Sequence, residues 1–324
     1  MRALVCHAWG ALDDLRVEEL PAPGPAADQV LIEVAATCVN YADALMVGGT
    51  YQTKPPLPFA PGLETAGTVT ACGAAVTRFK PGDRVMALLA YGGLAEQAVA
   101  AESDTWAIPA AMSFTDAAAF PVAYLSADVA LRWQGRLALG ETLLVLGAAG
   151  GVGLSAVEIG RAMGARVIAA ASTAEKLAAA QSRGANELIN YAEEDLTAAV
   201  MKLTGDRGAD VCFDPVGGAM FDKALSALGW GGRVVLVGFV GGVPQIPANR
   251  LLVKHRAALG SSLRYFRWQA QDKLQISAAA LLAWYAAGRL RPLVTHELPL
   301  ARGVEAIKLL TERRAHGRVL VRPR

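Results

Sequence analysis

The sequence predicts an α/β protein in which a β-rich domain precedes a doubly wound parallel sheet. The chain has 324 residues, and a single hydrophobic core seldom grows beyond about 250–300 residues. Residues 1–122 hold short apolar segments separated by proline and glycine clusters, which is typical of short strands and turns. From residue 123 onward, strand and helix patterns alternate, as they do in a doubly wound sheet.

The predicted elements follow in chain order. The first strand begins at the N-terminus, and further strands of the β-rich part are expected at residues 30–35, 67–71 and 84–89. Buried parallel strands are expected at residues 141–147, 166–171, 210–214, 232–238 and 256–261. A helix over residues 274–287 and a strand over 318–321 form a tail too short for its own domain. We therefore predict one domain from 1–122 with 263–324, and a second from 123–262.

Composition and charge argue against several classes of protein. Hydrophobic residues make up 53% of the chain and charged residues 19%, and the net charge of +2 does not favour binding to nucleic acid or to an anionic membrane. No apolar run reaches the roughly 18–20 residues that a membrane span needs, and no signal-peptide cleavage site follows the first apolar residues. None of the four cysteines shares CxxC spacing with another. We expect a cytoplasmic protein with reduced thiols.

A glycine loop lies between a predicted strand and a predicted helix. It has the pattern Ala148-x-Gly150-x-x-Gly153, which is the fingerprint of a dinucleotide-binding site in that context. Ala148 is expected to permit the tight turn, Gly150 to admit the pyrophosphate, and Gly153 to let the helix pack on the strand. The helix N-terminus offers N–H groups to the phosphates. The residues expected to bind the cofactor here are Ala149, Gly150, Gly151, Val152 and Gly153.

The end of the next strand indicates NADPH in preference to NADH. Sites for NAD usually carry an acidic residue about 20 residues after the loop, where it binds the ribose hydroxyls. The chain instead has Ala170-Ala171-Ser172-Thr173. Ser172 is expected to hydrogen-bond the 2′-phosphate, with charge from Lys176 and a second hydroxyl from Tyr191. A solvated lysine on the helix surface is the alternative for Lys176.

Several segments together resemble the medium-chain dehydrogenase/reductase superfamily. The closest likeness is to its zinc-free, zeta-crystallin-like NADPH:quinone oxidoreductases, over essentially the whole chain. The resemblance implies a GroES-like catalytic domain before a Rossmann domain, and a homodimer formed through the last strand of the dinucleotide domain. The matching segments are Val39–Asp43, Gly49–Tyr51, Pro58–Gly62, Lys80–Val85, Ala148–Gly153 and Asp214–Gly218.

The resemblance also implies that no metal is bound. Zinc alcohol dehydrogenases carry a cysteine ligand where this chain has Asn40, and a histidine ligand where it has Leu63. Leucine cannot bind zinc. The four histidines are scattered along the sequence, and the cysteines lack the spacing of a structural zinc site. Hydrogen-bond donors must then stabilise the charge that develops on the acceptor oxygen.

The candidates for catalysis and substrate binding also follow from the resemblance. Tyr51 and Asn40 are the expected catalytic donors, although Tyr51 can also be read as a packed loop tyrosine and Asn40 as a turn-capping residue. Ser126 resembles a hydroxyl residue that faces the nicotinamide, although Tyr124 replaces the glycine usual in that run. Further cofactor contacts are expected from Gly238, Phe239, Val240, Ser262 and Leu263. The candidate substrate residues are Asn40, Asp43, Tyr51, Tyr91, Phe239 and Phe266.

The function that these residues predict is transfer of a hydride from NADPH to a quinone or another conjugated carbonyl acceptor, without zinc. Two alternatives stay open. An enoyl-CoA or enone reductase of the same superfamily would recruit basic residues such as Arg264 and Arg267. A crystallin-like protein would bind NADPH without catalysis. The predicted partners are therefore a small-molecule acceptor and a second copy of the chain, with no nucleic acid and no membrane.

Overall fold

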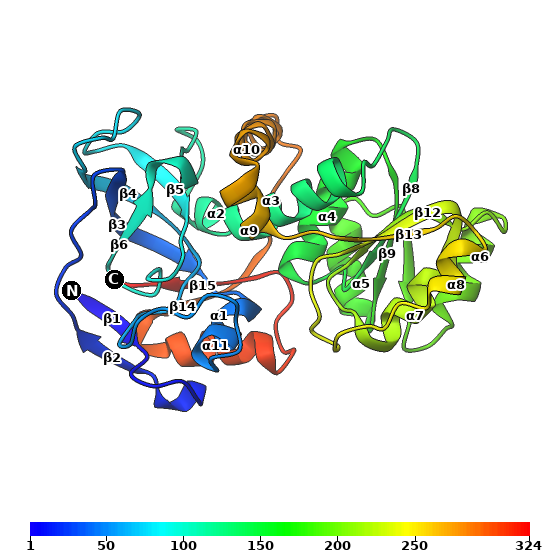
Figure 1. The fold of residues 1–324 in the computed structure, drawn as a ribbon, viewed down its shortest axis with the longest axis horizontal. Helices are drawn as coiled ribbons and strands as arrows, with labels where there is room; N and C mark the ends of the chain where they lie inside the picture. The colour runs from blue at the N-terminus through cyan, green and yellow to red at the C-terminus, as the bar shows by residue number, and fades with distance from the viewer. The chain divides into compact units, whose positions relative to one another are not determined.

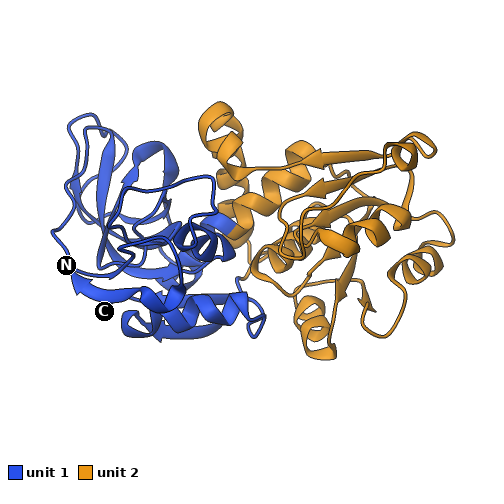
Figure 2. Ribbon diagram, turned by 60° about the horizontal axis from the view of Figure 1, so that its bottom comes forward, with its two compact units in different colours: residues 1–122, 292–324 blue, residues 123–291 orange.

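A computed structural model describes all 324 residues, Met1–Arg324. The chain forms two compact units (Figure 2). Unit 1 consists of Met1–Val122 and Pro292–Arg324, and unit 2 consists of Ala123–Arg291. None of the helices is long and apolar enough to cross a membrane.

Unit 1 is built mainly from antiparallel strands. A two-stranded sheet pairs β1 with β2, and a seven-stranded sheet has the order β14-β15-β3-β4-β5-β7, with β6 also paired to β3. Only β14 and β15 run parallel in this unit. The strands are β1 (Arg2–Val5), β2 (Arg16–Glu19), β3 (Gln29–Cys38), β4 (Glu64–Cys72), β5 (Arg84–Leu88), β6 (Gln97–Ala101), β7 (Thr105–Ala107), β14 (Val294–Pro299) and β15 (Arg318–Arg322). The helices are α1 (Tyr41–Val47), α2 (Phe114–Ala118) and α11 (Gly303–Thr311), with 3₁₀ turns η1 (Leu12–Asp14), η2 (Glu102–Asp104) and η4 (Leu300–Arg302).

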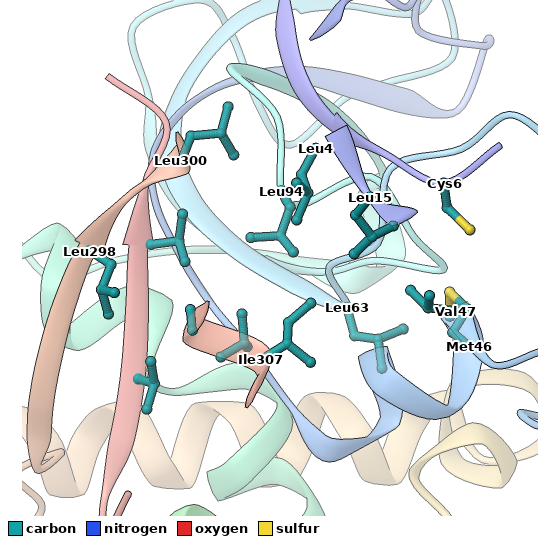
Figure 3. Close-up of a cluster of buried hydrophobic side chains, with 14 of the residues drawn as sticks. Leu4, Cys6, Leu15, Met46, Val47, Leu63, Leu94, Leu298, Leu300 and Ile307 are labelled. Atoms are coloured by element: carbon teal, nitrogen blue, oxygen red, sulfur yellow. The ribbon is translucent and has the colours of Figure 1, made fainter. Parts of the chain in front are cut away.

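The C-terminal tail completes the core of unit 1. Leu320 of β15 pairs with Cys38 of β3, so the chain returns to the unit in which it began. Leu298, Ile307 and other residues of the tail pack with Leu4, Met46 and Leu63 in one hydrophobic cluster (Figure 3). Alternate residues of β3 are buried, as period-2 patterning requires of a strand that covers a core.

Unit 2 is a parallel sheet with the strand order β10-β9-β8-β11-β12-β13. The order reverses between the neighbours β8 and β11, which is the switch point of a doubly wound sheet. The strands are β8 (Thr142–Leu146), β9 (Arg166–Ala171), β10 (Glu187–Asn190), β11 (Ala209–Asp214), β12 (Leu228–Leu236) and β13 (Ala257–Gly260). The helices are α3 (Pro121–Asp128), the π-helical turn η3 (Val129–Gln134), α4 (Gly151–Ala162), α5 (Ala174–Ser182), α6 (Leu196–Thr204), α7 (Gly218–Ala227), α8 (Ala248–Leu252), α9 (Leu263–Gln269) and α10 (Gln271–Ala286). The α3 helix begins just before the boundary between the units.

Helices cover both faces of this sheet (Figure 1). A cluster on one face joins Leu144 and Cys212 of the strands to Val200 of α6 and Phe221 of α7. On the other face, the backbone of Gly160 in α4 lies so close to Leu143 that an added Cβ would come within 2.6 Å of the leucine side chain. The predicted fold class, a doubly wound α/β sheet with a GroES-like domain, is confirmed.

Residues 263–291 belong to unit 2, although the sequence analysis assigned them to the first domain. The indole of Trp133 donates a hydrogen bond to the hydroxyl of Ser277 in α10 (3.0 Å), and Lys273 lies over the Trp133 ring. The guanidinium of Arg132 lies over the ring of Trp284 in the same helix. These contacts with η3 attach α10 to the second unit, and no local sequence pattern specifies such a partner.

Candidate dinucleotide and acceptor sites

The glycine loop connects the carboxyl end of β8 to the N-terminus of α4. The Gly150 N–H donates to the Gly147 carbonyl (2.9 Å), and α4 begins at Gly151 without a capping side chain. A Cβ on Gly153 would lie 2.2 Å from the Gly147 oxygen, so only glycine fits there. The N–H groups of the first turn are therefore available to an anion, as a pyrophosphate requires.

The tight turn depends on a residue that the sequence analysis did not assign to it. Gly147 has a φ of 56°, in the left-handed region that favours glycine, whereas we expected Ala148 to make the turn. Ala148 is buried, and its N–H donates to the Ala170 carbonyl of β9 (3.1 Å). The left-handed turn of the loop therefore lies at Gly147, one residue before the first residue of the sequence fingerprint.

Ser172 and Tyr191 lie at the carboxyl edge of the sheet. Asn190 of β10 pairs with Ala171 of β9, so the residues that follow these strands, Tyr191 and Ser172, are neighbours. Both side chains are partly exposed, as is that of Lys176 in the first turn of α5. Thr173 caps α5 by accepting a hydrogen bond from the Lys176 N–H (3.3 Å). The edge offers hydroxyls and an ammonium group, and the residue that follows β9 carries no carboxylate.

Loops that follow β11 and β12 pack together at the same edge. The Gly241 N–H donates to the Val216 carbonyl, and the Gly218 N–H donates to the Gly242 carbonyl, both at 2.7 Å. The backbone of Gly147 lies against the Val216 side chain, which joins these loops to the glycine loop at the switch point. Gly238 lies within this packed region, and the next two residues, Phe239 and Val240, are exposed.

The segment that follows β13 contains both exposed and buried residues. Ser262 is exposed and precedes α9, and Leu263 is partly exposed at its first position. The Ser261 N–H donates to the Leu236 carbonyl of β12 (2.9 Å), which fixes this segment at the carboxyl edge. Phe266, a candidate substrate residue, is a fully buried core residue. Its ring does not line an open surface.

A buried hydrogen bond explains the tyrosine at position 124. Ser126 lies partly buried in α3, and two residues before it the hydroxyl of Tyr124 donates to Glu158 Oε2 of α4 (2.5 Å). Glu158 Oε1 accepts the Arg291 N–H at 3.1 Å. Burial raises the pKa of Glu158 to about 7, even though these hydrogen bonds lower it. Sequence reasoning missed Glu158, which lies on the inner face of a helix read only for its apolar residues.

In unit 1, Asn40 and Asp43 belong to one buried polar cluster with Glu64 and Arg318. Asn40 Nδ2 donates to Glu64 Oε1 (2.8 Å), and Asn40 Oδ1 accepts from Arg318 Nη1 (3.1 Å). The Arg318 guanidinium also forms an ion pair with Glu64, and Glu64 Oε2 accepts the Val122 N–H at 2.7 Å. Both polar atoms of the Asn40 amide therefore have partners inside this unit.

Asp43 connects this cluster to the start of α1. One carboxylate oxygen accepts the Asn40 N–H (2.6 Å) as part of a capping box in which Asn40 is the N-cap, and the other oxygen accepts the Gly62 N–H (3.0 Å). Burial raises the pKa of Asp43 to about 7 and raises the pKa of Glu64 as well. Sequence reasoning missed Glu64 and Arg318 as members of the site, because 254 residues separate them.

The Tyr51 loop lies against Trp9, whose ring contacts Phe59, which in turn contacts Tyr91. Tyr51 is partly buried and packs against the main hydrophobic cluster of unit 1. A Cβ on Gly49 would lie 3.2 Å from Trp9, so the indole covers the backbone of this loop. The Phe59 ring lies 5.5 Å from that of Trp9 and 6.1 Å from that of Tyr91, between centroids. Trp9 and Phe59 were not among the predicted site residues.

Known proteins match the chain along its whole length. An alcohol dehydrogenase GroES-like domain matches residues 26–110, and a zinc-binding dehydrogenase model matches residues 151–279. Quinone oxidoreductase-like protein 2 of Rattus norvegicus is 38% identical over 325 residues, which cover 99% of this chain and 91% of the relative. Quinone oxidoreductase of Escherichia coli, solved with NADPH, superposes with a TM-score of 0.93 at 29% identity over 100% of each chain. The chain belongs to the quinone oxidoreductase family. This family is part of the medium-chain dehydrogenase/reductase superfamily, as the sequence predicted, and membership makes the chain an oxidoreductase.

The residues of this family member do not fit a catalytic zinc ion. Leu63 is buried in the hydrophobic cluster of unit 1, and the Asn40 amide is held by Glu64 and Arg318. No three or more histidine, cysteine, aspartate or glutamate side chains gather anywhere in the chain in a way that holds a metal ion.

Glu158→Gln is expected to flatten the dependence of stability on pH. The native carboxyl has a pKa of about 7 and binds its proton more tightly than an unfolded glutamate with its ordinary pKa of 4.5. This contribution to folding is fully present below the unfolded pKa and is lost as pH rises through 7, a loss on the order of 3 kcal/mol. Urea unfolding of wild type and variant at pH 5 and pH 8 measures the difference.

Two features define the controls for this experiment. Asp43 also has a raised pKa, so it too lowers stability as pH rises, and it does so in the variant as well as in wild type. The pH dependence of stability is therefore smaller in the variant but not absent. Glu193→Gln, at an exposed position, should leave the wild-type profile unchanged. Equal slopes for wild type and Glu158→Gln would mean that Glu158 does not titrate in this range.

Proposed function

We propose that this oxidoreductase is a zinc-independent, NADPH-dependent reductase of quinones or other conjugated carbonyl compounds. The proposal rests on the edge formed by the glycine loop and the end of β9. There the chain has Ser172 at the position where NAD sites usually have an acidic residue. The relative from Escherichia coli was solved with NADPH, and the curated relatives carry the name quinone oxidoreductase, which supports the same cofactor and acceptor class here.

Unit 2 would hold the dinucleotide. When bound, NADPH supplies a hydride to the acceptor. The first-turn N–H groups of α4 bind the pyrophosphate, and Ser172, Lys176 and Tyr191 bind the 2′-phosphate. The loops that follow β12 and β13 orient the nicotinamide end, together with Ser126. The residues assigned to that end are Gly238, Phe239, Val240, Ser262 and Leu263.

Unit 1 would bind the acceptor and stabilise the oxygen that gains negative charge. Reduction of a quinone to a hydroquinone takes up one hydride from NADPH and one proton, which together supply both hydrogens of the product. We assign the donation of a hydrogen bond or proton at the acceptor oxygen to the Tyr51 hydroxyl. Asn40 and Asp43 act as positioning residues, because their polar atoms are committed to the α1 capping box and to Glu64 and Arg318.

Steady-state assays of NADPH oxidation test this function. We expect turnover with 1,4-benzoquinone and 1,4-naphthoquinone, a clear preference for NADPH over NADH, and no loss of activity on treatment with a zinc chelator. Tyr51→Phe should lower kcat about 100- to 1,000-fold, the usual range for removal of one general-acid or oxyanion donor, while leaving the Kd for NADPH unchanged. Absence of turnover with a broad quinone panel contradicts the proposal.

Parallel assays separate the remaining candidates. Faster reduction of crotonyl-CoA than of any quinone would favour an enoyl thioester reductase, which the exposed Arg264 near the start of α9 would support by binding phosphate. Tight NADPH binding without turnover of quinone, enone or thioester would favour a crystallin-like role. Each outcome is read from the same enzyme preparation, with the Kd for NADPH as the common reference.

We also propose that the protein is a homodimer joined at β13. This strand is the last of the unit 2 sheet and pairs only with β12, which leaves its outer edge open to a second copy. The neighbouring side chains of Leu252 and Val253 are exposed and apolar. Light scattering should give about twice the chain mass of 33.8 kDa, whereas the mass of a single chain contradicts the proposal.

A cytoplasmic location is proposed on the state of the thiols. All four cysteines are free, and three of them are buried. Disulfides are rare in the reducing cytosol. Fractionation of the source cells with an antibody to the protein tests this, and recovery in an extracellular or membrane fraction would overturn it.

A further inference from the structure

Three aromatic rings on unit 1 form a surface that the reaction proposed above does not by itself require. The Phe59 ring contacts the rings of both Trp9 and Tyr91, and we call these three residues the aromatic shelf. Trp9 is 38% exposed and Tyr91 is 39% exposed, while Phe59 is buried beneath them at 3%. Large aromatic side chains gain free energy by leaving water, so two exposed rings that contact the same buried ring are typical of a binding surface.

Backbone hydrogen bonds hold the loops that carry the shelf. The Cys6 N–H donates to the Phe59 carbonyl at 2.8 Å, and the Phe59 N–H donates back to the Cys6 carbonyl at 3.1 Å. The Gly92 N–H donates to the Ala60 carbonyl, also at 2.8 Å. Just after Trp9, the Gly10 N–H donates to the Val47 carbonyl at the end of α1 (3.0 Å). The rings are thus presented by anchored backbone, which lowers the ordering cost of binding a ligand.

The shelf adjoins the loop of the candidate proton donor. Trp9 covers the backbone of Gly49, two residues before Tyr51, closely enough that a Cβ there would lie 3.2 Å from the indole. An exposed aromatic ring therefore packs against the loop that carries the assigned proton donor. The indole is rich in π electrons and a quinone ring is poor in them, so the two rings attract when they stack.

We infer that Trp9 determines acceptor specificity by stacking against flat, fused-ring acceptors, with Phe59 packed against its ring and Tyr91 packed against Phe59. This inference rests on the proposed function and names the kind of acceptor that the same site prefers. The gain from stacking grows with the area of the flat ring. Acceptors with two or three fused rings therefore benefit most, one-ring quinones less, and non-aromatic enones least.

A panel of acceptors of increasing ring number tests the inference at saturating NADPH. The panel is 2-cyclohexenone, 1,4-benzoquinone, 1,4-naphthoquinone and 9,10-phenanthrenequinone. Trp9→Leu keeps apolar bulk and removes the ring, and it should raise KM about 10-fold for the two fused-ring quinones and at most about 2-fold for 2-cyclohexenone. Trp9→Phe should fall between wild type and Trp9→Leu. A uniform change in KM across the four acceptors overturns the inference.

Trp230→Leu is the matched control. Trp230 is exposed in unit 2 near the amino end of β12, at the edge of the sheet opposite to the strand carboxyl ends. The same substitution there should leave all four KM values as they are in wild type. If Trp230→Leu changes the fused-ring quinones as much as Trp9→Leu does, the effect is not a property of the shelf.

A binding measurement without turnover provides a second readout. With NADP⁺ in place of NADPH no hydride is available, so the Kd for 1,4-naphthoquinone is measured directly by calorimetry. Trp9→Leu should weaken it about 10-fold, and an unchanged Kd contradicts the inference. Failure of the proposed function looks different, because wild type would then turn over no quinone at all. If quinone turnover is the same in wild type and Trp9→Leu, the proposed function is retained and the inference about the aromatic shelf is overturned.

Discussion

Ser172→Asp is expected to weaken binding of NADPH about 100-fold and to improve binding of NADH, which reverses the cofactor preference. Ser172 directly follows β9 at the carboxyl edge, next to Tyr191. A carboxylate there repels a 2′-phosphate, and two like charges 4 Å apart cost on the order of 4 kcal/mol at an effective dielectric constant of 20. Solvent screening reduces this cost, and a 100-fold loss corresponds to about 2.7 kcal/mol.

The gain for NADH has a separate cause. Without the 2′-phosphate, an aspartate at this edge accepts hydrogen bonds from the ribose hydroxyls, as acidic residues do in sites for NAD. Fluorescence titration of both cofactors against wild type and variant measures the two Kd values. Because only the charge at one position changes, the ratio of the two constants is the informative quantity.

Two further variants test whether charge and position are responsible. Ser172→Ala removes a hydrogen bond without adding charge, and it should cost NADPH binding only about 3- to 10-fold. Ser182→Asp makes the same change at an exposed position at the other end of α5 and should leave both Kd values unaltered. If the ratio of the Kd values for NADPH and NADH is the same in Ser172→Asp as in wild type, this edge does not bind the 2′-phosphate.

The sequence was most informative where function and fold depend on consecutive residues. The strand predicted at 166–171 matches β9 because a buried parallel strand is a continuous apolar run. The glycine loop was found for the same reason, since strand, turn and helix follow one another within a few residues. The steric demands at Gly153 come from local backbone contacts and so leave a local pattern.

Contacts between distant segments left no such pattern. Tyr124 was read as a departure from a family motif, and the structure shows it bonded to Glu158 on the next helix. The aromatic shelf comes from three separate loops, so no periodicity connects its members. Phe266, an aromatic residue near a strand end that the sequence analysis named as a substrate residue, is fully buried, and its burial also depends on contacts that no local pattern reveals.

The buried cluster around Asn40 shows what this limit means for function. Sequence resemblance named Asn40 as a catalytic donor, but resemblance cannot say which groups already occupy its amide. The structure places a glutamate from β4 and an arginine from β15 on its two polar atoms. A residue with both polar atoms engaged is better suited to hold α1 and the loop that follows than to donate to a substrate.

Arg318→Met is expected to destabilise the protein by about 3–5 kcal/mol, the usual cost of removing one partner of a buried ion pair. Arg318 is almost completely buried, and Glu64, its partner in the ion pair, is fully buried. Without the guanidinium, the carboxylate of Glu64 loses its counter-charge and Asn40 Oδ1 loses a donor. Methionine keeps most of the side-chain volume, so the loss reflects charge and hydrogen bonding more than a cavity.

The loss should depend on pH in a definite direction. Burial already raises the pKa of Glu64, and the attraction of Arg318 opposes that rise. Removal of Arg318 therefore raises this pKa further, so the native variant binds a proton that the unfolded chain releases. The variant is thus least destabilised at low pH and loses stability as pH rises through the native pKa of Glu64. Urea unfolding at pH 5 and pH 8 measures both the loss and its sign.

Two companion variants show whether the buried charge is the cause. Arg322→Met lies on the same strand and breaks the partly exposed ion pair with Glu297, which should cost no more than about 1 kcal/mol. Glu64→Gln combined with Arg318→Met removes both charges and should recover part of the loss, because no carboxylate is left unpaired in the core. If Arg318→Met costs no more than Arg322→Met, the cluster does not hold unit 1 together. The positioning role of Asn40 would then lose its physical basis.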